Sequence, residues 1–302
     1  MTRQQASARR HMSSASGKEQ VITAYAMLIP SLVILGIFVF YPIVAAAYMS
    51  LTSWDGFNPE MPFVGLDNYL NLAKNPEFWN SLTVTVIYAA GVSVLSVLTG
   101  LVFAILLDAP IRGRGIYRTI YFLPVVTSSV AVAIVWKYML DDSGLVNNWL
   151  GHLGITGPDW LQNRWIALAA LTLLTVWKNL GFNIVLYLTA LQGLPRSVFE
   201  AAEIDGANKL QQIRFMTVPL LRPMTFFVVV QALINSFQAF DLVYVFTEGG
   251  PRGGTDVLGM MMYRQAFRLG NFGYGTAISL VTLVLVLVVT LAQWKFSETE
   301  QK

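Results

Sequence analysis

Residues 82–107 read LTVTVIYAAGVSVLSVLTGLVFAILL, and this stretch decides the class of fold. It contains no Asp, Glu, Lys or Arg, and the uncharged run begins at residue 78. A helix that crosses the hydrocarbon core of a bilayer needs about 20 mostly apolar residues. The stretch meets that requirement, so it predicts a membrane-spanning helix.

Comparable stretches recur along the rest of the chain. One of them, residues 165–193, carries a single charge on Lys178, and the others carry none, over residues 20–54, 119–136, 223–240 and 269–294. We therefore expect an all-α integral membrane fold with six helices, over residues 23–50, 82–107, 116–139, 165–192, 223–247 and 272–296.

The six helices make up one transmembrane domain, expected over residues 23–296 between polar tails at 1–22 and 297–302. The first apolar stretch is far longer than the roughly 7–15 apolar residues of a signal peptide. We therefore expect this stretch to be retained as a span rather than cleaved.

The composition supports a membrane protein and excludes several other classes. Of the 302 residues, 55% are hydrophobic and 12% are charged, against about 45–50% and about 25% in soluble domains. The absence of cysteine excludes disulfides and thiolate metal sites. With two histidines, no H-E-x-x-H motif and no pair of carboxylates at membrane depth, no catalytic or metal-binding constellation is visible. We expect neither an enzyme nor a metal site.

The basic residues indicate the direction of the chain through the membrane, because loops rich in Lys and Arg stay cytoplasmic. With the N-terminus inside, 13 of them lie on the cytoplasmic side and 6 outside. We expect both termini in the cytoplasm. The net charge of +3 is then a signal of topology, and we expect no nucleic-acid partner.

The loop after the fourth predicted span, residues 193–222, carries helix-capping signals. Ser197 followed by Glu200 matches a capping box and predicts that a helix starts there. Gly206 suits the position just past its end, where a left-handed backbone is needed. Asn208 predicts the cap of a second short helix.

The second helix should run until Pro219 disrupts it. On the first helix, Val198, Phe199 and Ala202 share one apolar side. Such a side can enter a groove of a partner protein, or the helix can lie on the membrane surface. The pattern alone leaves both readings open.

Polar side chains gather near the middle of the fourth and fifth spans, where they are costly unless they face a cavity or a partner. Straight helices bring the two sets to a similar depth. They comprise Lys178, Asn179, Phe182, Asn183, Asn235, Ser236, Gln238 and Asp241. Two interpretations remain open. Lys178 and Asp241 can form a structural pair with amide contacts between helices, or the set can line the path of a small polar solute.

The third span has Thr127, Ser128 and Ser129 after Pro124. Hydroxyl groups can satisfy backbone groups that a proline frees. We favour that structural role over contact with a solute.

Several segments together resemble the EAA signature of ABC importer permeases, in the sugar-type branch of that family. The signature-like segments are Glu200-Ala201-Ala202, Asp205-Gly206-Ala207 and Val218-Pro219-Leu220. Similar flanking segments are Leu51-Thr52-Ser53-Trp54-Asp55-Gly56, Phe63-Val64-Gly65-Leu66-Asp67-Asn68-Tyr69, Arg112-Gly113-Arg114-Gly115, Phe122-Leu123-Pro124, Ser236-Phe237-Gln238-Ala239-Phe240-Asp241 and Gly249-Gly250-Pro251. Their order and spacing extend over roughly residues 23–296.

The resemblance implies a type I ABC importer bundle that works with partners: a second homologous permease subunit, two ATP-binding subunits and an extracytoplasmic solute-binding protein. The short cytoplasmic helix would contact an ATPase through Ser197, Glu200, Ala201, Ala202, Asp205, Gly206 and Ala207. ATP and Mg²⁺ would be held by those partners, since this chain has no G-x-x-x-x-G-K-[ST] motif and needs no cofactor of its own.

The resemblance implies a sugar or related polyol as the solute, with glycerol phosphate or another anionic sugar derivative as the alternative. A stand-alone secondary transporter is a rival interpretation, but proton coupling usually needs several buried carboxylates. Asp241 is the one clear acid at membrane depth.

Overall fold

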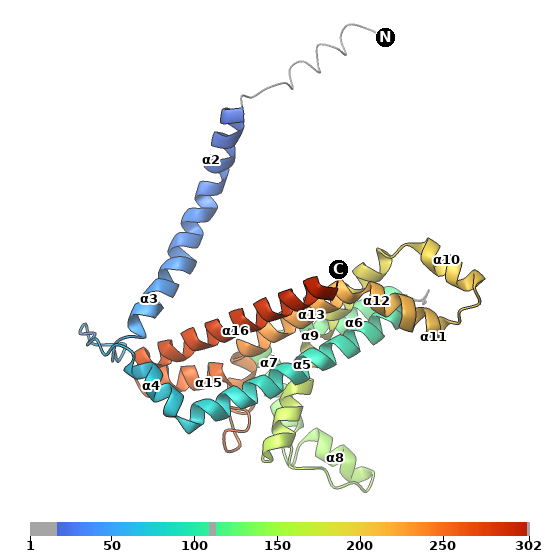
Figure 1. The fold of residues 1–302 in the computed structure, drawn as a ribbon. Helices are drawn as coiled ribbons and strands as arrows, with labels where there is room; N and C mark the ends of the chain where they lie inside the picture. The colour runs from blue at the N-terminus through green and yellow to red at the C-terminus, as the bar shows by residue number, and fades with distance from the viewer. Residues whose placement is uncertain (1–16, 109–112, 301–302) are drawn as a thin grey trace.

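The computed structural model describes residues 17–108 and 113–300, and helices form its regular structure apart from one antiparallel bridge between Thr52 and Phe63 (Figure 1). In the first half of the chain the elements are α2 (Gly17–Leu35), the π-helical turn η1 (Gly36–Phe40), α3 (Tyr41–Met49), α4 (Asp67–Lys74), α5 (Pro76–Asp108), α6 (Arg114–Val126), α7 (Ser129–Met139) and α8 (Leu145–His152).

In the second half, the elements are α9 (Arg164–Gln192), α10 (Arg196–Ile204), α11 (Lys209–Gln212), η2 (Ile213–Thr217), α12 (Val218–Leu220), α13 (Arg222–Phe237), α14 (Asp241–Phe246), α15 (Leu258–Tyr263), η3 (Arg264–Arg268) and α16 (Phe272–Glu300). The predictions for the outermost tail residues, 1–16 and 301–302, and for Arg112 lie outside the described residues.

Four helices are long and apolar enough to cross a membrane on their own, over Val21–Met49, Pro76–Asp108, Arg164–Gln192 and Phe272–Lys295. Two bent helix pairs, one of them α6 with α7, bring the number to six if each pair counts as one span. The predicted all-α, multi-span class is confirmed. The first and last helices are longer than predicted, since α2 begins at Gly17 and α16 ends at Glu300.

The third predicted helix, 116–139, is not continuous. It bends by 98° between α6 and α7, and Thr127 at the break has an extended backbone. Pro124 in the last turn of α6 cannot donate a backbone hydrogen bond and crowds the preceding turn. The Thr127 hydroxyl donates to the carbonyl of Leu123 at 2.8 Å. The carbonyl that Pro124 leaves without its N–H partner is that of Ile120, and Ser129 lines the cavity described below, so the structural role expected for these hydroxyls stays a prediction.

The fifth predicted helix, 223–247, is also broken. Helix α13 ends at Phe237 and α14 begins at Asp241, and Phe240 between them has φ −146° and ψ −57°. No proline or glycine causes this break. Irregular backbone at membrane depth is tolerated where it is buried in protein or lines a cavity, and the cavity described below supplies that setting.

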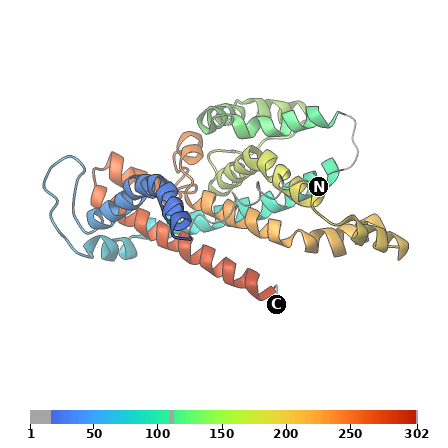
Figure 2. The ribbon, with the colours of Figure 1, turned by 90° about the horizontal axis from the view of Figure 1, so that it is seen from above.

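The core of the bundle forms where α5 packs against α9 and α13. Figure 2 shows α16 on one side of this core and the segment from α6 to α8 on the other. Gly181 in α9 lies directly against the backbone carbonyl of Tyr121 in α6, so a larger residue at 181 would separate the two helices.

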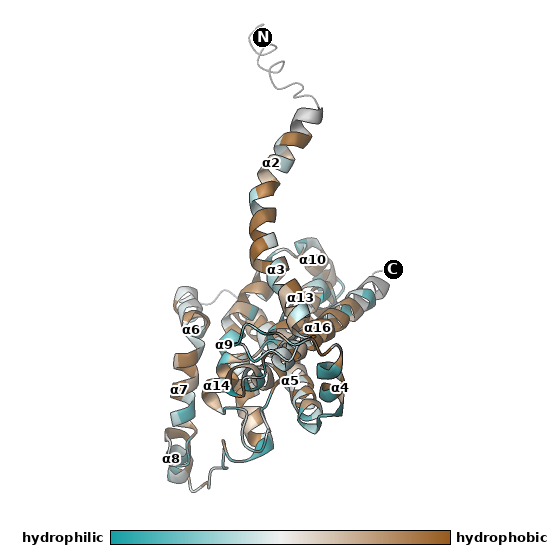
Figure 3. Ribbon diagram, turned by 90° about the vertical axis from the view of Figure 1, so that its left-hand side faces the viewer, coloured by the Kyte–Doolittle hydropathy of each residue, from teal (hydrophilic) through white to brown (hydrophobic). Residues whose placement is uncertain are grey.

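The two ends of the bundle differ in their elements (Figure 1). Helices α4 and α15 and the start of α16 lie at one end, which we call the α4 end. Helices α10 and α11 and the C-terminus of α16 lie toward the other, which we call the α10 end. Helix α2 projects away from the bundle, whereas α3 packs against α16 (Figure 1), and the ribbon of both is largely apolar (Figure 3). No residue in the most apolar window of α2–α3 is buried.

Candidate functional site

A cavity of about 440 Å³ lies inside the bundle between α5, α9, α13 and α14. All eight residues predicted for the solute path line it: Lys178, Asn179, Phe182, Asn183, Asn235, Ser236, Gln238 and Asp241. The volume is within the range of about 300–1,000 Å³ typical of small-molecule sites.

Helical spacing explains how α9 contributes four of these residues. Lys178 and Phe182 are four residues apart, as are Asn179 and Asn183, so one face of the helix presents them together. Asn183 is 7% exposed. Gly100 of α5 lies against Asn183, and this close approach holds the face of α9 beside α5.

The break between α13 and α14 supplies the opposite wall. Gln238 lies in the break, and Asp241 begins α14. Gly259 of α15 packs directly against the carbonyl of Ala239, so a neighbouring helix supports the irregular segment. A continuous helix over 223–247 would direct these side chains differently, because successive helical residues are rotated by about 100°.

Lys178 and Asp241 share the cavity without pairing. Within the described part of the chain, the ion pairs are Arg264–Glu77, Arg264–Asp256 and Arg268–Glu248, none of which involves Lys178. The expectation of a structural Lys178–Asp241 pair is therefore not met in this conformation. Both charged groups are free to face a solute.

Two further polar atoms at the cavity are buried without a partner. They are Oε1 of Gln231 and Oγ of Ser236, and neither has a hydrogen bond within the described residues. Leaving a buried polar group unsatisfied costs about 1–3 kcal/mol. A polar solute or water that enters the cavity can remove that cost.

The sequence analysis missed the contribution of the second span. Tyr88, Val92 and Ser96 of α5 line the cavity, and the Tyr88 hydroxyl lies 2.8 Å from the Thr175 hydroxyl. The spacing of four residues between the three positions places them on one face. That spacing, with two polar residues in an apolar span, is the signal that could have found them.

The predicted short helix in the 193–222 loop exists as α10, but its N-terminal cap differs from the prediction. The helix starts at Arg196 after Pro195, and no side chain caps it. The prediction of a capping box formed by Ser197 and Glu200 is therefore wrong. Pro195 precedes the first helical turn, where its missing N–H has no cost.

The other capping predictions in this loop are confirmed. Gly206 has φ +79°, as the position after a helix end requires. The N–H of Gly206 donates to the carbonyl of Glu203, and the N–H of Ala207 donates to the carbonyl of Ala202. Asn208 and Gln211 form a reciprocal capping box at 2.9 and 2.8 Å. The second helix ends at Leu220, one residue after Pro219.

The free side of α10 is not the one expected. Ala202 is 2% exposed, and Val198 and Phe199 are partly buried, so the apolar side faces the protein itself. Five other residues predicted to contact an ATPase are exposed: Ser197, Glu200, Ala201, Asp205 and Gly206. Ala207 is partly buried. Ile204, 87% exposed, joins the five exposed residues.

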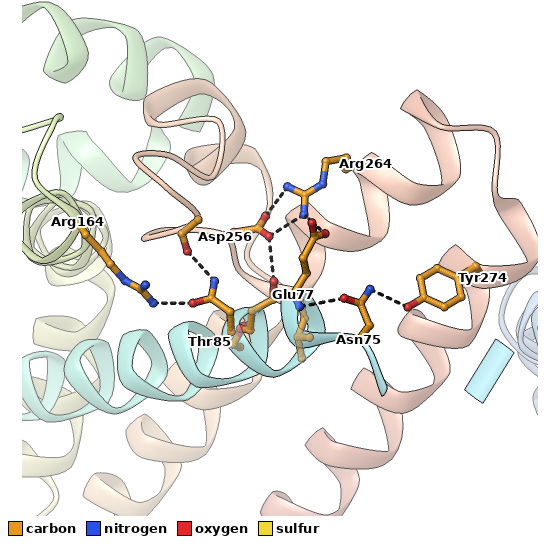
Figure 4. A network of polar contacts seen from close by, with 11 residues as sticks. Asn75, Glu77, Thr85, Arg164, Asp256, Arg264 and Tyr274 are labelled. Atoms are coloured by element: carbon orange, nitrogen blue, oxygen red, sulfur yellow. Dashed lines mark hydrogen bonds and ion pairs between the residues drawn. The ribbon is translucent and has the colours of Figure 1, made fainter. Parts of the chain in front are cut away.

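A network of polar contacts lies at the α4 end, and within the described residues Nε of Arg164 is the atom in it that is buried without a partner (Figure 4). Arg264 donates to both carboxylate oxygens of Asp256, at 3.1 and 2.9 Å, and Ser81 donates to Oδ2 at 2.9 Å. Asp256 is 3% exposed. Arg164 of α9 joins through Asn80, whose amide donates to Gly253 O. Of these residues, Arg164 and Arg264 entered the prediction only as basic residues of the outer side, and the network itself was not predicted.

Comparison with known proteins identifies the family. Residues 96–296 match the family model described as "Binding-protein-dependent transport system inner membrane component". The chain is 36% identical over 272 residues to the trehalose/maltose transport system permease protein MalF of Thermococcus litoralis, covering 90% of this chain and 92% of that protein. It is 32% identical to the sn-glycerol-3-phosphate transport system permease protein UgpA of Salmonella choleraesuis, covering 91% and 94%.

A solved structure shares the fold. It is a bacterial alginate ABC transporter in complex with an alginate pentasaccharide-bound periplasmic protein, with a TM-score of 0.82, 22% identity and coverage of 94% of this chain and 96% of that one. The chain therefore belongs to the family of inner-membrane components of binding-protein-dependent transport systems. It is a multi-pass permease subunit of an ABC transporter and not an enzyme.

Proposed function

We propose that the chain passes a sugar or related polyol across the cytoplasmic membrane, through the 440 Å³ cavity, by alternating access. The gathering of amides and Phe182 around this cavity carries the proposal. Amide groups both donate and accept hydrogen bonds, as a solute rich in hydroxyl groups requires. The trehalose/maltose permease among the relatives supports the same solute class.

The energy for transport is proposed to come from two partner ATPase subunits, which hold ATP and Mg²⁺. Helix α10 offers them the exposed side that contains Glu200, Ala201 and Ile204. Ala202 on its other side is buried, and Phe199 and Glu203 of α10 line a pocket together with Ile105 of α5 and Leu191 of α9, so a force on α10 can reach the spans. The chain itself has no phosphate-binding loop motif.

Two further partners are part of the proposal: a second homologous permease subunit and an extracytoplasmic solute-binding protein. The projecting apolar helix α2 supports the first, since an assembly can cover surface that this chain leaves bare. The alginate transporter, solved with its periplasmic protein, supports the second.

We place both termini and the α10 end in the cytoplasm, with residues 23–296 as the transmembrane domain between short tails. The loop charges support this direction, with 13 basic residues on that side and 6 on the other. The end of α16 and helix α10 lie toward the same end of the bundle, as this topology requires (Figure 1).

An anionic sugar derivative or glycerol phosphate is the second candidate solute. The unpaired Lys178 in the cavity favours it, because a cation at membrane depth needs a counter-ion. The nearby Asp241 weakens the attraction for an anion. The relative that transports sn-glycerol-3-phosphate is consistent with this alternative.

Reconstitution tests the proposal. The assembly of this chain with its partner permease, two ATPase copies and binding protein should take up radiolabelled trehalose or maltose into liposomes only with ATP. Uptake of the same sugars by the chain alone would instead establish a secondary transporter. ATP-dependent uptake of glycerol 3-phosphate with no sugar uptake would support the second candidate.

A further inference from the structure

A second pocket, of about 380 Å³, opens at the α4 end of the bundle. It lies between the loop that precedes α4, α4 itself, η3 and the start of α16. Its lining consists of Ser53, Trp54, Asn68, Asn71, Asn75, Gln265, Asn271 and Tyr274. Five of these carry side-chain amides and none carries a charge.

We propose that this pocket binds a neutral saccharide ring at the outer mouth of the solute path. The inference rests on the proposed function of the chain as a sugar permease, and it adds a binding site separate from the central cavity. Three observations carry it: the free hydrogen-bonding groups of the pocket, the rigidity of its walls, and a row of aromatic rings that leads away from it.

The pocket retains unused donors and acceptors. Asn71 makes no hydrogen bond within the described residues and is exposed. Gln265 uses only Oε1, which accepts from Asn271 at 3.3 Å, so its amide nitrogen is available. Because each sugar hydroxyl both donates and accepts, a wall of amides can match it in either role.

The walls are fixed before any ligand enters. Asn68 donates to the carbonyls of Ser50 and Thr52, both at 2.8 Å, and is 8% exposed. Asn75 donates to the Tyr274 hydroxyl at 3.1 Å, and Figure 4 shows these two side chains meeting between α4 and α16. A site that is already ordered loses less conformational entropy when it binds.

A row of aromatic rings leads from the pocket to the break between α13 and α14, which borders the central cavity. Trp54 in the pocket contacts Phe272, and the ring centroids follow one another at 5.6 Å (Trp54–Phe272), 5.0 Å (Phe272–Phe267), 5.5 Å (Phe267–Tyr263) and 4.8 Å (Tyr263–Phe240). Every ring in the row is at least partly exposed. The Phe240 ring lines a separate pocket beside α15, which shares Gln238 with the central cavity.

Aromatic faces present a large apolar surface, and the apolar face of a pyranose ring stacks on such a surface. The row can therefore guide a saccharide from the amide pocket toward Gln238 at the edge of the cavity by a series of similar contacts. The guanidinium of Arg268 lies over the Tyr263 ring of the row, outside the pocket lining, and is weakly paired with Glu248 at 3.9 Å. A free carboxylate or phosphate finds no counter-ion in the pocket lining.

The absence of cysteine from the chain allows a direct test. The variant Asn71→Cys, in the reconstituted assembly without binding protein or ATP, is labelled with N-ethylmaleimide in the presence of trehalose, maltose or glycerol 3-phosphate. At a sugar concentration ten times the Kd, labelling should slow about tenfold, because only about a tenth of the sites stay free. Lys74→Cys, in the same helix but outside the pocket lining, is the matched control and should not slow. Ser53→Cys, on the opposite wall, repeats the test if Asn71→Cys assembles poorly.

Protection of both pocket positions by a sugar, but not by glycerol 3-phosphate, supports the proposal. Protection by neither sugar, or equal protection by glycerol 3-phosphate, overturns it. In a second arm, the binding protein is added without sugar. Protection of the pocket positions in that arm alone also overturns the proposal and assigns the pocket to protein docking. Wild-type sugar uptake measured in the same liposomes separates the two claims, since uptake without protection refutes the pocket alone and leaves the transport function standing.

Discussion

Two groups of polar side chains lie between the helices of this permease, and they differ in how completely their hydrogen bonds are made. At the α4 end, Asp256 is held by Arg264 on both oxygens and by Ser81. In the central cavity, Lys178 and Asp241 have no partner within the described residues, and Oγ of Ser236 is buried unpaired. The comparison teaches that the paired charges of Asp256 and Arg264 hold the helices, whereas the unpaired charges of Lys178 and Asp241 mark the proposed path of the solute.

The largest effect on assembly is expected from Asp256→Ala. This change leaves Arg264 and Ser81 without their acceptor at a site where Asp256 is 3% exposed. Removing one member of a buried pair costs about 3–5 kcal/mol. We expect about half of that, because the Arg264 side chain remains 29% exposed and keeps Glu77 at 3.5 Å. Thermal unfolding of the purified assembly in detergent measures it, and a wild-type midpoint would contradict a structural role for the network.

A comparable change in the cavity should instead remove transport and leave assembly intact. Lys178→Met keeps the length of the side chain but not its charge. We expect uptake to fall at least about tenfold, which corresponds to about 1.4 kcal/mol, with normal amounts of assembled complex. The measurement is ATP-driven uptake normalised to complex in the membrane, and normal uptake would refute the assignment of Lys178 to the solute path.

A smaller effect is expected where the broken helix is supported. In Gly259→Ala the new methyl group would press on the carbonyl of Ala239, which lies in direct contact. Overpacking of this kind costs about 1–3 kcal/mol, and the displaced segment carries Gln238. We expect reduced uptake and a modestly lower unfolding temperature. Gly115→Ala is the control because no atom lies within 4 Å of a methyl group at that position.

The smallest effect is expected from Glu248→Gln. The pair of Glu248 with Arg268 is long, at 3.9 Å, and both side chains are about half exposed, at 56% and 45%. Exposed pairs of this kind contribute about 0–1 kcal/mol. The midpoint of thermal unfolding should hardly move. A fall in the midpoint as large as that caused by Asp256→Ala would show that solvent exposure does not explain the different contributions of the two ion pairs to stability.

Much of the fold could be predicted from the sequence, because uncharged stretches of about 20 residues have few alternatives to crossing a membrane. The eight cavity residues could also be found, since amides and charges at membrane depth need a reason to be there. The ends of α10 and α11 were readable where a short-range rule applied, at Gly206 and Asn208.

The remaining features depend on contacts between segments far apart in the chain. The break at residues 238–240 has no proline or glycine and depends on its place beside the cavity and on Gly259. The capping box at Ser197 failed because the helix already starts at Arg196, with Pro195 in the capping position. The burial of Ala202 likewise cannot be read from an amphipathic pattern, which shows an apolar side but not whether the protein itself covers that side.

The contrast between the paired and unpaired groups is tested most directly by a structure of the assembled importer with trehalose or maltose bound. We predict sugar density in the 440 Å³ cavity between α9 and α13, in contact with Asn179, Asn235 or Gln238, and an Asp256–Arg264 pair unchanged from the sugar-free state. Density for the sugar elsewhere, with Lys178 bonded to Asp241 across the cavity, would show that the cavity residues are structural.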